Sequence, residues 1–382
     1  MHHPLRRIYG VSFIFALNIA LTAYINSTFL SQFFSERAVG FLFAGAALLT
    51  IIALEILPLS IKKIGARMTT GFVLLSSLAT LIILTNANDA RTAGLFFVLY
   101  NICNTLVIFC FDIFIGHFSK RGNTGNARGS YLTITNLGWL ASPFLAGFLV
   151  SHLGYSTLYS LVAGLVTLAL ATFVVTLRHY EDANYVRRSP LVALKKVRHM
   201  PNIIRILTVN FLLQFFFSWM IIFTPVYLHE IVGLPFDTIG KIFTVMLLPF
   251  VLLSIPLGRV ADRTWGEKEI LIAGITIMGI ATWMFASYGG TSTIVFAAIL
   301  FFTRVGAASV ETMCETYFFK EVSDKEPDVV SLFRTTVPLA FMIGPLVATM
   351  LLAYSSHTVL FYSLGCIVLL GLIPALTLKD TK

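Results

Sequence analysis

Between two apolar runs, 238–260 and 269–288, the chain reads Gly258-Arg259-Val260-Ala261-Asp262-Arg263-Thr264-Trp265-Gly266-Glu267-Lys268. This stretch holds three cations and two carboxylates, whereas the runs on either side are mainly apolar. A run of about 20 mainly apolar residues is long enough for a helix to cross the hydrocarbon core of a bilayer. The stretch 258–268 therefore indicates a polar connection at a membrane surface between two spanning helices.

The same alternation of long apolar runs and short polar connections extends along the whole chain. The runs are continuous, which favours helices over the alternating strands of a membrane barrel. Of the 382 residues, 57% are hydrophobic and only 12% are charged, which excludes an ordinary soluble enzyme and a disordered protein. We predict an all-α integral membrane protein with twelve spanning helices, at residues 8–34, 39–60, 68–86, 92–118, 129–151, 154–177, 203–230, 238–260, 269–288, 292–320, 329–354 and 357–377.

The placement of Lys and Arg predicts the orientation of these helices. With twelve spans, 22 of the 27 Lys and Arg residues fall on the side that holds both termini, three fall on the other side, and Arg304 and Arg334 lie within spans. An excess of Lys and Arg marks cytoplasmic loops. We therefore expect both termini to be cytoplasmic, and the short loops favour a prokaryotic cytoplasmic membrane. The net charge of +9 is then a topology signal, and no nucleic-acid partner is expected.

The chain divides near its midpoint into two related halves. Residues 178–202 form a long basic connection, either a solvated linker or one that contains an amphipathic helix starting at Ser189-Pro190. Short patterns recur on either side of it at an offset near 200, such as Ser142-Pro143-Phe144-Leu145-Ala146 and Gly344-Pro345-Leu346-Val347-Ala348. Six spans per half is an even number, so both halves enter the membrane in the same sense. We expect two pseudo-symmetric six-helix bundles, residues 1–177 and 203–382.

The stretch 258–268 resembles the G-x-x-x-D-R-x-G-[RK]-[RK] loop of the major facilitator superfamily, with one extra residue before the second glycine. The resemblance implies a secondary transporter that works by alternating access, in which two bundles rock around a central site. In that family the loop is an inner-side latch, so Gly258, Asp262 and Arg263 become latch candidates, with Arg128 opposite them at the start of span 5. The alternative is that Asp262 and Arg263 only mark topology.

The corresponding loop of the first half departs from this pattern. Lys62 occupies the acidic position, and a lysine cannot favour a helix N-terminus as an acid does. We expect Glu55, one turn before Pro58, to pair with a cation and replace the missing acid. Span 5 also carries a variant of a motif that the family associates with exporters, Ser142 to Gly147. The motif favours efflux, but only slightly, since serine replaces its leading glycine.

Ionisable side chains inside the spans are the strongest candidates for function, since each costs at least ~2.5–3.5 kcal/mol at the bilayer centre on insertion scales. Arg304, Glu311 and Glu315 share one face of the span 292–320, and Asp112 corresponds to Glu315 at an offset of 203. In the family, spans 1, 4, 7 and 10 line the central cavity. We predict that these four residues bind substrate or the coupling ion. Asp112 and Glu315 have an alternative role as inner-gate partners of basic side chains.

Uncharged polar residues on the same spans are further candidates for substrate contact. They are Asn18, Asn26, Gln32, Asn101, Asn104, Asn210, Gln214 and Trp219, of which Asn18, Asn101, Asn104 and Gln214 are the predicted substrate contacts. The alternative for each is an interhelical hydrogen bond, which is worth only ~0.6 kcal/mol on average.

The sequence contains no P-loop, metal-ligand cluster or catalytic motif, so we predict no enzyme activity, no metal and no cofactor. The predicted partners of a monomeric transporter are a small-molecule substrate, protons and membrane lipids. Proton coupling is favoured over sodium coupling. A non-coupled facilitator, a lipid flippase and a ligand-sensing protein on the same scaffold remain the alternatives.

Overall fold

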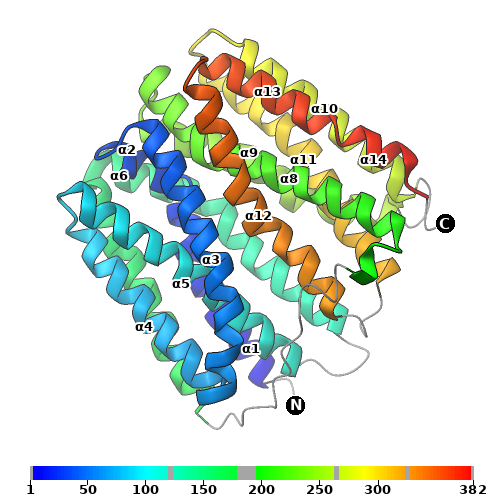
Figure 1. The fold of residues 1–382 in the computed structure, drawn as a ribbon. Helices are drawn as coiled ribbons and strands as arrows, with labels where there is room; N and C mark the ends of the chain where they lie inside the picture. Colours follow the sequence, from blue (N-terminus) through cyan, green and yellow to red (C-terminus); the bar gives the residue numbers. More distant parts are fainter. Residues whose placement is uncertain (1–2, 119–123, 179–194, 262–265, 323–326, 380–382) are drawn as a thin grey trace. The chain divides into compact units, whose positions relative to one another are not determined.

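The computed structural model describes residues 3–118, 124–178, 195–261, 266–322 and 327–379, and in these ranges it contains helices and no strand (Figure 1). Contacts between helices divide the chain into two compact units. The first comprises Met1–Arg187 with Pro235–Lys241, and the second comprises Arg188–Leu234 with Ile242–Lys382.

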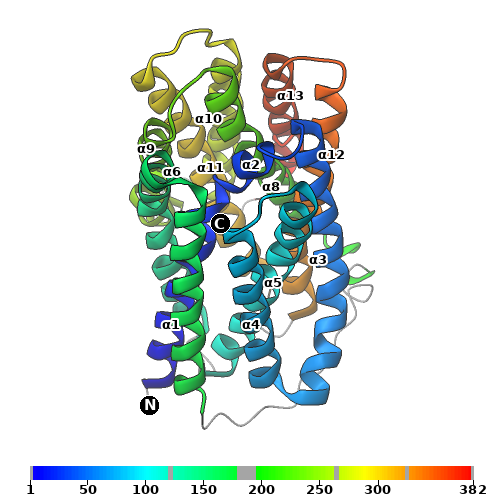
Figure 2. The same cartoon turned by 90° about the vertical axis from the view of Figure 1, so that its left-hand side faces the viewer.

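The first unit packs its helices around α1 and α5. Helix α1 lies against α6 and α5, while α4 lies against α5 and α6, and α3 against α5 (Figure 2). The helices of this unit are α1 (His3–Ala23), α2 (Asn26–Ser31), α3 (Glu36–Ile64), α4 (Ala66–Thr85), α5 (Ala90–Phe118) and α6 (Thr124–Thr176).

The second unit repeats this plan with α8 and α11 at its centre. Helix α8 lies against α12 and α11, and α10 lies against α11 and α13. Its elements are α8 (Pro201–Val226), the π-helical turn η1 (Tyr227–Ile231), α9 (Phe236–Val260), α10 (Glu267–Ser287), α11 (Thr293–Glu321), α12 (Pro327–Leu352), α13 (His357–Leu369) and α14 (Leu372–Thr377). The first turns of α9, Pro235–Lys241, pack with the first unit.

Helix α6 contains two spans that meet at Gly154. The backbone there has φ 80° and ψ 173°, a conformation that glycine adopts readily because it has no Cβ. Gly154 is the first residue of the predicted span 154–177, so the turn lies at the predicted boundary.

The prediction of twelve spans is confirmed by the described helices. Ten of them are long and apolar enough to cross a membrane, and one of the ten, Leu137–Thr176, holds the two spans that meet at Gly154. A shorter apolar helix, Arg7–Ala23, continues through α2 as the first span. In the most apolar 18-residue stretch of α3, only 39% of the residues are buried within the protein. The exposed face of this helix carries Leu48, Ile52 and Ile56. Such an exposed apolar face is suited to contact with lipid tails.

Candidate functional site

A group of four charged side chains occupies α11 and α12 in the second unit. Arg304, Glu311 and Glu315 follow one face of α11, as the spacing predicts. Arg304 is only 1% exposed. Its guanidinium carbon lies 5.1 Å from the ring centre of Phe216 and 5.5 Å from that of Phe217, both on α8. These two aromatic faces hold the buried cation through cation–π attraction.

The opposite end of the group is an ion pair between α11 and α12. Arg334 Nη1 donates to Glu315 Oε1 at 2.7 Å, and the two side chains are 39% and 27% exposed. The Arg334 guanidinium also lies over the ring of Phe333, at 5.7 Å from the ring centre. Such a charge-assisted hydrogen bond fixes both side chains. The sequence identifies both residues as charges within spans, but not the contact between them.

Glu311 lies between Arg304 and Glu315 along α11 and is half-buried. The charges that act on its carboxyl are those of Glu315, Arg334 and Arg304. With all four groups ionised, the two arginines and two glutamates have a formal charge of zero. Protonation of one glutamate gives the group a net charge of +1. Proton binding can therefore change the affinity of the group for a charged ligand.

A hydrogen-bonded network joins α1 and α5 in the first unit. Asn18 Nδ2 donates to Asn104 Oδ1 at 3.1 Å, and Tyr100 Oη donates to Asn18 Oδ1 at 2.7 Å. The hydroxyls of Thr22 and Tyr100 are 2.9 Å apart. All four residues are buried. The structure thus brings Asn18 and Asn104 together through interhelical bonds. Tyr100 and Thr22 were not predicted from the sequence, although each lies one turn from an asparagine that was.

Asn101 and Asp112 are the other two candidates on α5. Asn101 Nδ2 donates to the carbonyl of Phe97 in its own helix, at 3.0 Å. Asp112, two turns beyond Asn104, is half-buried.

Helices α8 and α12 are held together by polar contacts and small residues. Trp219 Nε1 donates to the carbonyl of Gly344 at 2.7 Å, and Asn210 Nδ2 donates to Thr336 Oγ1 at 2.7 Å. A Cβ at Gly344 would overlap Ser218 Oγ, so any larger residue there requires the serine side chain to move. Gln214 is half-buried on α8 between the two contacts.

The predicted latch residues are only partly within the described residues. Asp262 and Arg263 lie outside them, as does the side chain of Arg128 in α6. Gly258 lies in the last turn of α9, and a Cβ there would meet no described atom within 4 Å. Glu55 is exposed on α3.

An ion pair with a buried carboxylate, which was not predicted from the sequence, lies at the end of the loop 258–268. Glu267, the first residue of α10, is 1% exposed, and its Oε1 accepts a hydrogen bond from Lys320 Nζ at 2.5 Å. Lys320 lies in the last turn of α11. The signal in the sequence is an acid in the first turn of a helix, where the helix dipole favours it.

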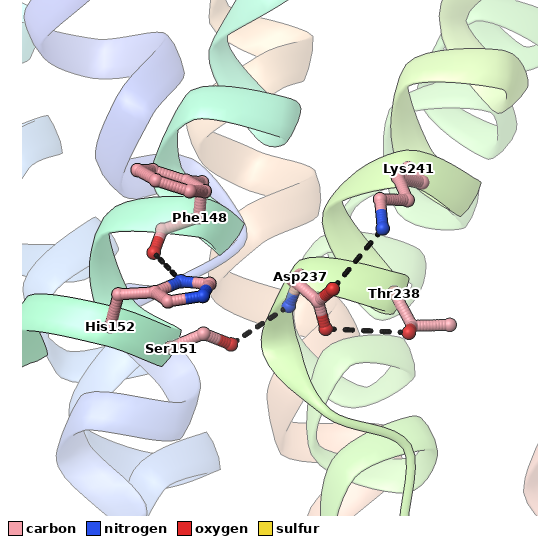
Figure 3. Close-up of polar contacts among 6 residues, drawn as sticks. All are labelled: Phe148, Ser151, His152, Asp237, Thr238 and Lys241. Atoms are coloured by element: carbon pink, nitrogen blue, oxygen red, sulfur yellow. Dashed lines mark hydrogen bonds and ion pairs between the residues drawn. The ribbon is translucent and has the colours of Figure 1, made fainter.

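The start of α9 packs closely against α6 (Figure 3). The backbone N–H of Asp237 donates to Ser151 Oγ at 3.0 Å, and the Asp237 carboxylate pairs with Lys241 at 3.2 Å. A Cβ at Gly240 would lie 2.5 Å from the carbonyl oxygen of Pro143, and a Cβ at Gly147 would overlap the carbonyl oxygen of Phe236. The two glycines therefore let the helix backbones touch.

Comparison with known proteins identifies the family. The profile of the Major Facilitator Superfamily matches residues 8–240 and 215–382. No curated protein sequence matches this chain significantly.

Solved structures share the fold at low sequence identity. The POT family transporter PepTSo aligns with TM-score 0.78 at 12% identity, over 98% of this chain and 97% of its own. A mutant of the nucleoside transporter NupG aligns with TM-score 0.75 at 12% identity, over 98% and 99% of the two chains. The human organic anion transporter MFSD10 aligns with TM-score 0.69 at 14% identity, over 97% and 99%. The chain therefore belongs to the Major Facilitator Superfamily and is a multi-pass membrane transporter of a small solute, not an enzyme.

Proposed function

We propose that this protein is a proton-coupled secondary transporter that works by alternating access, with Arg304, Glu311, Glu315 and Arg334 as its coupling group. The single observation that carries the proposal is the neutral set of two guanidinium and two carboxylate groups on α11 and α12. Efflux is the direction favoured by the motif Ser142 to Gly147.

The electrostatic interaction between Glu311 and a bound anion couples proton binding to substrate binding. Two unit charges about 5 Å apart interact by about 3 kcal/mol at an effective dielectric constant of 20. A proton on Glu311 therefore strengthens the binding of an anionic group to Arg304 or Arg334, and its loss weakens that binding. The half-buried ring of Phe217 offers an apolar surface to the rest of the substrate, whereas Phe216 is buried behind Arg304. Asp112, Asn18, Asn101, Asn104 and Gln214 are the further proposed contacts.

Alternating access requires a contact on each side of the membrane that closes while the other side is open. On the proposed topology, the contact of Ser151 with Asp237 and of Gly147 with Gly240 lies at the external side, where it closes the outer path. The loop 258–268 is the proposed inner latch, formed by Gly258, Asp262 and Arg263 with Arg128. Glu267 and Lys320 support this assignment because they anchor the end of that loop.

We further propose that the transporter acts as a monomer in the cytoplasmic membrane of a prokaryote, with both termini in the cytoplasm. Glu55 is the proposed acid of the first half's latch. The distribution of Lys and Arg supports this orientation.

The test begins with thermal unfolding of the detergent-purified chain in the presence of sugars, amino acids, nucleosides, organic anions and cationic drugs. A ligand that binds only the folded state raises the melting temperature. We expect an organic anion to do so more strongly at pH 5.5 than at pH 8, and we expect Glu311→Gln to remove this pH dependence. An equal response of the wild type, Arg304→Lys and Glu311→Gln would rule out this site.

The ligand found in this way is then followed in liposomes that contain a pH-sensitive dye. Solute flux accompanied by proton movement supports the proposed coupling. Flux without proton movement would assign a facilitator, and binding without flux would assign a ligand-sensing protein. Movement of a fluorescent lipid between leaflets would assign a flippase.

A further inference from the structure

A groove of about 550 Å³ opens on the surface of the first unit, where the start of α1 lies beside the end of α6 (Figure 2). It is separate from the charged group on α11 and from the network of Asn18. The side chains that line it are Arg7, Ala171, Thr172, Val175, Thr176 and Arg178.

One wall of the groove continues an apolar face of α6. Leu161, Leu168 and Val175 follow each other at intervals of seven residues, which places them on one side of the helix. They are 40%, 49% and 63% exposed. Ala171 is exposed on the same side, one turn before Val175. In a membrane-spanning helix such a face contacts lipid tails, so the groove is the end of a path along which an acyl chain can lie.

The groove ends at two cations. Arg178 follows Val175 by three residues at the end of α6, and Arg7 reaches the same place from the first turns of α1. Both side chains are exposed. A third guanidinium is close by, because Arg67 Nη1 donates to the backbone carbonyl of Arg178 at 3.0 Å. Among the described residues that line the groove, none carries a carboxylate.

The arginines are the charged side chains among the described residues that line the groove. The hydroxyl of Thr172 donates to the carbonyls of Leu168 and Ala169, at 2.7 and 3.0 Å, in its own helix. A guanidinium matches a phosphate with paired N–H donors, and it keeps its charge at any physiological pH. Basic pockets between spanning helices on the cytoplasmic side are typical binding places for anionic headgroups.

We propose that this groove binds an anionic phospholipid, with the phosphate between Arg7 and Arg178 and one acyl chain along Ala171 and Val175. The charge pattern selects the lipid class, because the guanidinium groups repel the ammonium of a zwitterionic headgroup. The lipid joins the start of α1 to the end of α6. This inference is independent of the transported substrate.

The experiment is a lipid titration of the delipidated full-length protein by native mass spectrometry. The two probes are dioleoyl phosphatidylglycerol and dioleoyl phosphatidylcholine. Two cations near a membrane surface are sufficient for a preference of about tenfold or more for the anionic lipid. We expect that preference in the wild type and its loss in Arg7→Gln/Arg178→Gln.

The matched control is Lys62→Gln/Lys63→Gln. It removes the same charge from an exposed site at the end of α3, in the same unit and on the same predicted side, but outside the groove. Phosphatidylglycerol binding by this variant is expected to equal that of the wild type. Equal losses in the two double variants would mean that net charge alone attracts the lipid, and no loss in either would place the lipid elsewhere. Both results overturn the proposal.

A second pair of measurements separates a lipid from a soluble phosphate. Val175→Trp fills the apolar part of the groove and keeps both arginines, so it should weaken phosphatidylglycerol binding. Free glycerol 3-phosphate shares the charged headgroup but has no acyl chain, and it should compete poorly. Full competition by glycerol 3-phosphate, or unchanged lipid binding by Val175→Trp, would contradict the lipid assignment. Thermal unfolding of each variant shows whether it is folded.

Discussion

Gly65 and Gly266 adopt the same backbone conformation at equivalent places in the two halves of the chain. Gly65 precedes α4 with φ 85° and ψ 158°, and Gly266 precedes α10 with φ 84° and ψ 172°. The offset of 201 residues agrees with the repeat seen in the sequence. The residues that follow differ, since Ala66 stands where the second half has Glu267. The repeat is therefore conserved in the turn, while the charge that stabilises the turn is present in one half only.

The first prediction concerns this turn. Gly65→Ala and Gly266→Ala should each lower the free energy of unfolding by about 1–3 kcal/mol, because a Cβ is strained at this combination of φ and ψ. The measurement is the melting temperature in detergent. Gly71→Ala is the control, since Gly71 is helical in α4 and a Cβ there meets nothing within 4 Å. An equal effect at Gly71 and Gly266 would show that the backbone conformation does not matter.

The pair of Glu267 and Lys320 gives the second prediction. Lys320→Met leaves the buried carboxylate of Glu267 without this cation and should destabilise the protein, by about 1–3 kcal/mol given that Lys320 is 40% exposed. Glu267→Gln should cost less, because the lysine then turns to water. Lys241→Met is the control, because it removes a cation from the more exposed pair with Asp237. A smaller effect for Lys320→Met than for Lys241→Met would contradict the argument.

The spans could be predicted from the sequence because each depends on local composition. The turn at Gly154 is an example, since it falls at the predicted boundary between 151 and 154. The contact of Arg334 with Glu315 could not be predicted in the same way. It depends on the rotation of α12 about its axis relative to α11, and an apolar run of this kind does not fix that rotation.

The polar candidates illustrate the same limit. Sequence position identifies Asn18 and Asn104 as buried amides on two spans, but their bond to each other and to Tyr100 requires the helices to be packed. The groove at Arg7 and Arg178 also joins residues that are far apart in the sequence. The sequence predicts that these arginines lie at one membrane surface. It does not predict that they lie beside the exposed apolar face of α6.

The third prediction concerns the contact of α6 with α9. Gly147→Ala places a Cβ against the carbonyl of Phe236 and should open the contact, which raises the reactivity of a cysteine at Ser151 toward a membrane-impermeant maleimide. The background is Cys366→Ala, since Cys366 is exposed and the other three cysteines are buried. Gly164→Ala is the control in the same helix, because a Cβ there meets nothing within 4 Å. Equal labelling of the two variants would exclude Gly147 from this contact.

The fourth prediction concerns stability against pH. The carboxylate of Asp89 caps α5 by accepting the backbone N–H of Thr92 at 2.9 Å, and this hydrogen bonding holds the pKa of Asp89 below its usual value. A carboxyl whose pKa is lower in the folded state stabilises the protein above its unfolded pKa, and that contribution is lost as the pH falls through the folded pKa. Asp89→Asn keeps a capping side chain that does not titrate. The wild type should therefore exceed Asp89→Asn in melting temperature at pH 6 to 7, and the difference should shrink toward pH 3. A difference that stays constant over this range would mean that the charge of Asp89 adds nothing to the cap.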